Sequence, residues 1–205
     1  ESAKVTVKEL AILMVGMEIN LGISKEPKDS GECVFLVKNL SVRNDAALTV
    51  LENVSFKIRK GEIFGLAGVS GNGQLELAET LAGLRLPQTG SIQINGEKVT
   101  KLTPKNMIKH GVGFLPENLV KTGVAGGLSV RDNAILKKNW TDVNLRRGIF
   151  KNNKAIDDFI SSIVERYDIR FSSSAVKAGL LSGGNLRKLV FARELENNPH
   201  LLIAC

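Results

Sequence analysis

Residues 63–75 read IFGLAGVSGNGQL, and they join an apolar stretch to a glycine-rich loop and the start of a helix. The apolar residues 63–67 predict a strand, and the leucine spacing of 74–84 predicts a helix with one buried face. Glycines at 68, 71 and 73 allow the backbone to curl so that successive N–H groups point inward toward an anion. A strand, a glycine loop and a helix in this order are the context of a phosphate-binding loop.

Two positions depart from the complete phosphate-binding motif. That motif is G-x-x-x-x-G-K-[ST], in which lysine contacts the terminal phosphates and the hydroxyl residue binds Mg²⁺. Gln74 and Leu75 hold these positions. The amide of Gln74 donates a neutral hydrogen bond, whereas Leu75 cannot coordinate a metal. We therefore predict a degenerate nucleotide-binding loop, with a plain glycine turn as the alternative. Its candidate residues are Gly68, Val69, Ser70, Gly71, Asn72, Gly73, Gln74 and Leu75.

A second candidate anion site is LSGGN, residues 181–185, before a helix predicted from 186 to about 197. The Ser182 hydroxyl, the N–H groups of Gly183 and Gly184 and the helix N-terminus converge there. An ordinary N-cap and loop is the alternative interpretation. Glu194 and Glu196, later in the same helix, are predicted to be surface charges.

The surrounding pattern alternates strands with helices. An inserted helical block in the second half predicts an α/β domain with a helical subdomain. The predicted strands are 34–37, 50–58, a hairpin over 91–99, 112–115 and 201–204, and the predicted helices are 103–110, 129–139 and 152–167.

The N-terminal residues 1–32 predict an interdomain linker with a short helix. Thr6 and Glu9 have capping-box spacing at the start of a helix over 5–17. The polar segment 22–32 contains glycine and proline and predicts a connector. We expect the apolar face of Leu10, Leu13, Met14 and Met17 to dock onto another surface.

Composition limits the classes of function. The 205 residues carry a net charge of +7, so nucleotide phosphates, nucleic acid and an anionic membrane surface are all plausible partners. The basic residues are scattered and aromatics are only 5%, which favours a solvated basic face over a nucleic-acid surface. Two cysteines without a Cys/His cluster support neither a zinc site nor a disulfide framework. Since no apolar run approaches the ~20 residues of a membrane helix, a membrane role would require a partner.

Several motifs in order resemble the ATPase domains of ABC transporters. They are SFKIRKGEIFGLAG before the loop, GVGFLPEN at 111–118, and LSGGN followed by ARELENNP at 192–199 and an apolar strand. The resemblance covers 34–205 and implies a P-loop NTPase fold with an antiparallel β subdomain. The domain would span 33–205, with a helical subdomain at about 119–180. GVSGNGQ, LPEN and LSGGN are similar to the second ATPase domain of duplicated ATP-binding subunits in sugar and nucleoside importers, and 6–18 resembles the connector between their halves.

The resemblance also implies which residues are changed. Glu117 occupies the Q-loop position, where glutamine usually contacts Mg²⁺, and Cys205 occupies the Walker B aspartate position. The sequence ends there, so the catalytic glutamate, D-loop and switch histidine would lie beyond it, and no residue is a confident catalytic candidate. The resemblance implies ATP as the cofactor. It also allows Mg²⁺, although the domain's own site lacks the residues that would bind this ion. We expect the chain alone to be inactive or a very weak ATPase.

ABC domains pair head to tail, so the resemblance implies that Leu181, Ser182, Gly183, Gly184 and Asn185 complete an ATP site on a partner. That partner would be the N-terminal ABC domain of the same subunit or an equivalent domain. Transmembrane permease subunits would hold the protein on the cytoplasmic face of the plasma membrane, and no nucleic acid is expected. Two alternatives remain: a soluble ABC ATPase acting on nucleic acid, and a structural P-loop remnant that binds no nucleotide.

Overall fold

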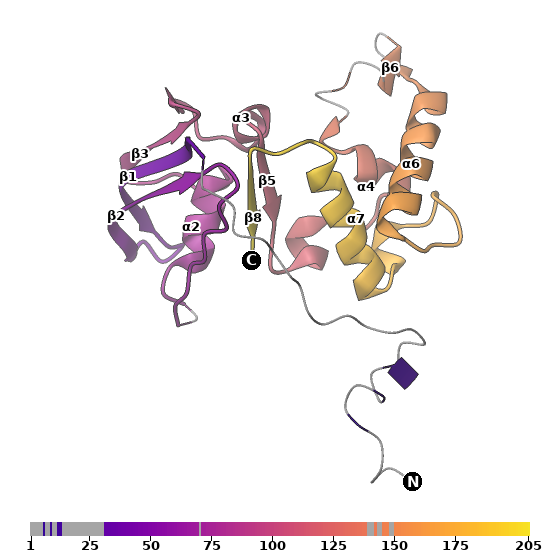
Figure 1. The fold of residues 1–205 in the computed structure, drawn as a ribbon, viewed down its shortest axis with the longest axis horizontal. Coiled ribbons are helices and arrows are strands. Elements are labelled where there is room, and N and C mark those ends of the chain that lie inside the picture. The colour runs from indigo at the N-terminus through magenta and orange to yellow at the C-terminus, as the bar shows by residue number, and fades with distance from the viewer. Residues whose placement is uncertain are drawn as a thin grey trace.

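The computed structural model describes Thr6, Glu9, Ile12, Leu13, residues 31–69 and 71–138, Asp142, and residues 145–147 and 150–205. An antiparallel sheet, a central pair of parallel strands and a group of helices lie next to one another in this order (Figure 1). The elements are β1 Cys33–Arg43, β2 Thr49–Arg59, α2 Gln74–Leu81, β3 Thr89–Ile94, β4 Glu97–Lys98, α3 Pro104–Lys109, β5 Val112–Leu115, the π-helical turn η2 Leu119–Gly123, α4 Val130–Ile135, β6 Arg146–Arg147, β7 Phe150–Lys151, α6 Asn153–Tyr167, the 3₁₀ turn η4 Ala178–Leu180, α7 Gly183–Leu195 and β8 Leu201–Ala204.

The antiparallel sheet has the order β2-β1-β3-β4, and an irregularity in β1 sets which side chains it buries. Phe35 and Val37 alternate toward the core, but the next buried side chains are Leu40 and Val42, one residue out of step. Asn39 lies between the two pairs with φ of 49°, and the register with β2 shifts there. A bulge of this kind returns a strand's apolar side chains to the same face. The predicted hairpin over 91–99 is confirmed as β3 and β4.

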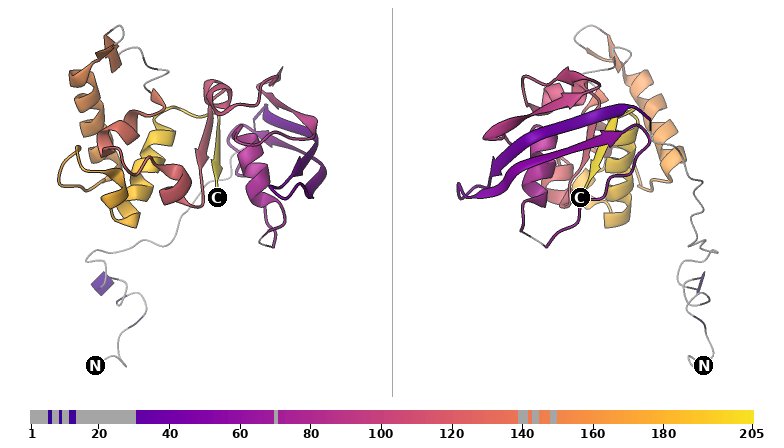
Figure 2. Two further views of the ribbon diagram at one scale, coloured as in Figure 1. Left: turned by 180° about the vertical axis from the view of Figure 1, so that it is seen from behind. Right: turned by 60° about the vertical axis from the view of Figure 1, so that its left-hand side comes forward.

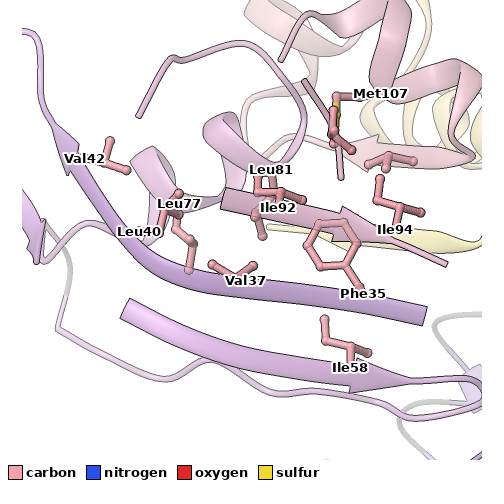
Figure 3. Close-up of a cluster of buried hydrophobic side chains, with 12 residues drawn as sticks. Phe35, Val37, Leu40, Val42, Ile58, Leu77, Leu81, Ile92, Ile94 and Met107 are labelled. Atoms are coloured by element: carbon pink, nitrogen blue, oxygen red, sulfur yellow. The ribbon is translucent and has the colours of Figure 1, made fainter. Parts of the chain in front are cut away.

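Helix α2 covers the inner face of this sheet. Leu77 lies beside Leu40 and Leu81 beside Ile92, as Figure 3 shows, and all four are buried. Met107 from α3 closes the same core and is 1% exposed. Burial of a large apolar side chain contributes roughly 1.5–3 kcal/mol, so this contact fixes α2, and with it the glycine loop, on the sheet.

The helices α4, α6 and α7 form a second core. The stripe predicted for 152–167 is confirmed, because Ile156, Ile160 and Ile163 of α6 are buried. They pack in one cluster with Val130 of α4 and Leu189 of α7. Helix α7 therefore belongs by its packing to the helical part of the molecule.

The parallel strands β5 and β8 stand between the two cores, as Figure 2 also shows. Their register pairs Val112 with Leu201 and Leu115 with Ala204, and the Cys205 N–H donates to the Leu115 carbonyl at 3.0 Å. Both strands run in the same direction, so the segments that follow them emerge at one edge. The predicted strands 112–115 and 201–204 are confirmed.

The prediction of a strand over 63–67 is wrong. These residues have no regular secondary structure, and Ile63 is 81% and Leu66 54% exposed. The ring of Phe64 instead stacks on Phe56 of β2, with centroids 5.1 Å apart. A cavity separates the segment from β8, so an apolar sequence suited to a strand has no partner edge within the described residues.

Only part of the N-terminal prediction falls on described residues. The capping box is confirmed, because the Thr6 N–H donates to Glu9 Oε2 at 2.8 Å and the Glu9 N–H to Thr6 Oγ1 at 3.3 Å. Ile12 and Leu13 are both helical, and the side chain of Leu13 is exposed. Leu10, Met14, Met17 and the linker residues 22–30 lie outside the described residues. No helix among those described is long and apolar enough to cross a membrane.

Candidate functional site

The glycine loop leads from 63–67 into α2. Gly71 and Gly73 have φ of 90° and 91°, the left-handed region that side chains disfavour. Gly73 is the N-cap of α2 and supplies no side-chain acceptor to its first N–H groups. A Cβ atom on Gly73 would lie 2.8 Å from Leu51 Cδ2 and 2.9 Å from the Val50 carbonyl oxygen. Close packing on β2 therefore requires glycine at this position as well. Ser70 lies outside the described residues.

Gln74 and Leu75 begin α2, as their place in the loop motif requires. The Gln74 amide turns back on the loop, where Nε2 donates to the Val69 carbonyl at 3.1 Å. Leu75 is 48% exposed and presents an apolar side chain at the motif's hydroxyl position. The loop therefore leads into α2 in the predicted order, with a neutral amide and an isobutyl group at its end.

The residues singled out from three distant stretches of sequence line one cavity. Gln74, Leu75, Glu117 and Cys205 share a cavity of about 650 Å³ between β2, α2 and β8. The parallel pairing explains the last two, because Glu117 follows β5 and Cys205 follows β8. The structure thus brings these positions together along one cavity, although 63–67 does not pair with β8.

Cys205 lies in an environment that opposes ionisation. Burial raises the pKa of its thiol, and the negative charges of Glu117 and Glu79 raise it further. The protonated thiol is therefore the dominant form near neutral pH, and a neutral thiol is a poor ligand for a hard cation. Among the described residues, no group of three or more His, Cys, Asp or Glu side chains could hold a metal ion.

The LSGGN motif forms the start of α7. Helix α7 begins at Gly183, three positions earlier than predicted, because Ser182 is its N-cap and accepts from the Asn185 N–H at 3.4 Å. The Asn185 side chain is held by Ser182 Oγ at 3.0 Å and by the Arg170 N–H at 2.8 Å. A Cβ atom on Gly183 or Gly184 would meet nothing within 4 Å. The helix N-terminus is therefore ordered by side chains yet open to solvent, with Leu181 half-buried behind it.

The two motifs lie in different parts of the molecule. The glycine loop adjoins the antiparallel sheet, the start of α7 lies in the helical part, and β5 and β8 stand between them (Figure 1). Both motifs lie on the side of the molecule where β8 ends, and the reverse view in Figure 2 agrees.

Sequence reasoning missed a buried ionic cluster beside this region. Glu194, predicted to be a surface charge, is 1% exposed. Its carboxylate bonds to Lys137, two residues beyond the end of α4, accepts from Arg193 Nε at 3.1 Å and accepts from the Phe114 N–H of β5 at 3.1 Å. The cluster ties α7 and the turn after α4 to β5, the strand that precedes Glu117. The sequence around Glu194 does not indicate burial, because Lys137 and Phe114 lie 57 and 80 positions away along the chain.

Comparison with known proteins identifies the family. A model described as ABC transporter matches residues 51–204. The glucose import ATP-binding protein TsgD13 of Haloferax volcanii is 38% identical over 205 residues, which are 99% of this chain and 37% of that protein. The guanosine import ATP-binding protein NupO of Bacillus subtilis is 34% identical over 96% of this chain and 38% of that protein. The chain thus spans less than two fifths of the relatives it matches.

Solved structures agree with this fold. The dimeric bacterial ABC transporter cassette MJ0796 superposes with a TM-score of 0.66 at 22% identity, over 83% of this chain and 72% of that chain. CbiO1 of Clostridium perfringens, part of an ABC transporter complex, gives 0.60 at 18% identity, over 84% and 64%. At these identities the likeness establishes the fold, the ABC ATPase form of the P-loop NTPases. The family model matches residues 51–204, which are most of the chain, and the solved structures share its fold. This chain therefore belongs to the ABC transporter family.

Proposed function

We propose that this chain is the second nucleotide-binding domain of a duplicated ATP-binding subunit that energises uptake of a nucleoside or simple sugar. The names of the relatives, which import glucose and guanosine, support this class of solute. Their length supports a larger subunit, because the chain spans 37% and 38% of them. In this proposal residues 1–32 connect to the preceding domain, and 33–205 form the nucleotide-binding domain.

The observation that carries the proposal is a contrast between two motifs. The start of α7 is capped by Ser182 and open to solvent over Gly183 and Gly184. Its N–H groups and helix dipole are suited to the terminal phosphate of an ATP molecule held by another domain. The loop before α2 has Gln74 and Leu75 where a cation and a hydroxyl would be needed. The domain therefore contributes its signature to a partner's active site.

The domain's own loop is a degenerate site. Mg²⁺ prefers carboxylate, hydroxyl and water oxygens in an octahedral arrangement. Of the positions expected to serve it, Leu75 offers no ligand, Cys205 offers a protonated thiol, and Glu117 alone offers a carboxylate. These residues do not fit the metal. We therefore expect nucleotide to bind here without turnover, and the isolated chain to be inactive or nearly so.

The partners follow from this role. The first ABC domain of the same subunit, or an equivalent domain, would supply the intact phosphate loop. Permease subunits would supply the membrane path and hold the assembly on the cytoplasmic face. The net charge of +7 is the feature that favours the other candidate, an ABC ATPase acting on nucleic acid.

Replacing Ser182 with arginine in the full-length subunit tests the function. The bulky cation blocks the open start of α7, so ATP turnover by the assembled transporter should be abolished. Ser172→Arg is the matched control, since it places the same side chain on an exposed loop of the helical part and should leave turnover unchanged. Full turnover in the Ser182 variant would exclude a catalytic role for this signature. Turnover that requires DNA or RNA would favour the nucleic-acid alternative.

A further inference from the structure

The side chain of Gln74 occupies the space above the glycine loop. Its Nε2 donates to the Val69 carbonyl oxygen at 3.1 Å. A Cβ atom built on Gly68 would lie 2.0 Å from the same nitrogen and 3.1 Å from Gln74 Cδ. The amide therefore lies directly against the backbone of the first glycine of the loop.

The Val69 carbonyl is the acceptor around which the loop closes. Besides the Gln74 amide, the Asn72 N–H donates to it at 3.2 Å. Two donors from the second half of the loop thus converge on one carbonyl oxygen in its first half. A phosphate cradle needs the opposite polarity, with N–H groups directed at the anion. In this conformation the Asn72 N–H and the Gln74 amide are directed at the Val69 carbonyl oxygen and not at an anion.

We propose that Gln74 is an internal competitor of the nucleotide: its amide holds the loop closed on the Val69 carbonyl, and a polyphosphate binds only after this contact opens. The inference rests on the proposed function in one respect, that this loop is a nucleotide site at all. It goes beyond the loss of lysine, because it assigns the replacing residue an activity of its own. Gln74 becomes the residue that sets how weakly the degenerate site binds.

The competitor has a calculable effect. A neutral hydrogen bond contributes about 1 kcal/mol net, and releasing one before binding lowers an apparent affinity by about five-fold. Gln74→Ala removes the amide, keeps a good helix former at the first position of α2, and should therefore tighten polyphosphate binding about five-fold. Gln74→Glu removes the donor but adds a negative charge in the same place, so it should bind more weakly than Gln74→Ala.

The test uses the whole chain and isothermal titration with inorganic tripolyphosphate, then with ATP, both without Mg²⁺. Gln88→Ala is the matched control, an exposed glutamine beyond α2 whose removal should leave both affinities unchanged. Circular dichroism confirms that each variant is folded. Tighter binding by Gln74→Ala alone supports the proposal. Equal or weaker binding by Gln74→Ala, or a failure of every variant to bind either probe, overturns it.

A second measurement does not depend on affinity. The side-chain amide signals of Gln74 are assigned in a ¹⁵N NMR spectrum by their loss in Gln74→Ala. Saturating tripolyphosphate should shift these signals and speed their exchange with solvent, because the bond to Val69 is broken. Unchanged signals in a saturated sample would overturn the proposal. Neither measurement involves ATP turnover. The proposal for Gln74 can therefore fail while the proposed role of the signature, which the Ser182 variant tests, still holds.

Discussion

The ionic cluster around Glu194 makes a quantitative prediction. Glu194→Ala removes a carboxylate that is 1% exposed and leaves Lys137 and Arg193 without it, at side-chain exposures of 20% and 8%. Removing one partner of a buried ion pair costs roughly 3–5 kcal/mol. Because the Lys137 ammonium retains some access to water, we expect the lower end, about 3 kcal/mol. For a chain of this size that corresponds to a fall in Tm of roughly 6–12 °C.

Urea unfolding of the chain, followed by circular dichroism, measures this cost. Glu165→Ala on the exposed side of α6 is the matched control and should change the free energy of unfolding by less than about 0.5 kcal/mol. If Glu194→Ala destabilises no more than the control, the cluster does not stabilise the join between α7 and β5. Glu194→Gln should cost less than the alanine variant, because an amide oxygen still accepts from the Phe114 N–H.

The same cluster predicts a dependence on pH. Burial lowers the pKa of Lys137, and the Glu194 carboxylate counteracts this effect. In Glu194→Ala the folded-state pKa of the amine falls further below its unfolded value. Folding then requires an unfavourable buried charge or the loss of a proton. The penalty is largest at neutral pH and shrinks as pH rises toward the amine's unfolded pKa, and unfolding of both forms at several pH values checks this. A penalty that stays constant with pH would contradict the assignment.

Three further changes follow from the packing and the cavity. Gly73→Ala should destabilise the chain by roughly 1–3 kcal/mol in urea, because it combines a positive φ with a 2.9 Å approach to the Val50 carbonyl; an unchanged midpoint would show that the loop relaxes freely. Ile156→Ala should cost roughly 2–5 kcal/mol, since the side chain is 0% exposed in the helical core, and a cost near zero would mean that the core collapses around the gap. Glu117→Gln should lower the pKa of the Cys205 thiol and speed its alkylation by iodoacetamide at a fixed pH; an unaltered rate would exclude this carboxylate as a cause of the shift.

Periodic elements were predictable from the sequence. The stripe of α6 and the strands β5 and β8 are encoded by local spacing of apolar residues. Parallel strands bring their ends together, so the convergence of Glu117 and Cys205 follows from pairing alone. The start of α7 was misplaced by three residues, because glycines 183 and 184 are poor helix formers and the Ser182 cap overrides this preference.

Features that depend on tertiary partners were not predictable. The segment 63–67 has strand composition, but Phe64 stacks on β2 and a cavity lies between the segment and β8. Glu194 has the sequence context of a surface helix position, and only the packing of α4 and β5 against it makes it buried. The amide contact between Gln74 and Val69 is likewise a matter of side-chain orientation. Composition gives a residue's preference, and the neighbour decides whether that preference is met.

Gly73 bears on how such a loop changes over evolutionary time. Its close approach to Leu51 and Val50 demands a residue without a side chain, whether or not any phosphate is bound. Selection for stability alone would therefore preserve this glycine in a loop that no longer needed to support hydrolysis, whereas no such packing constraint holds the exposed side chain of Leu75. A glycine pattern can thus outlive the chemistry for which it arose. In chains of this kind, the residues at the end of the loop are the better record of present activity.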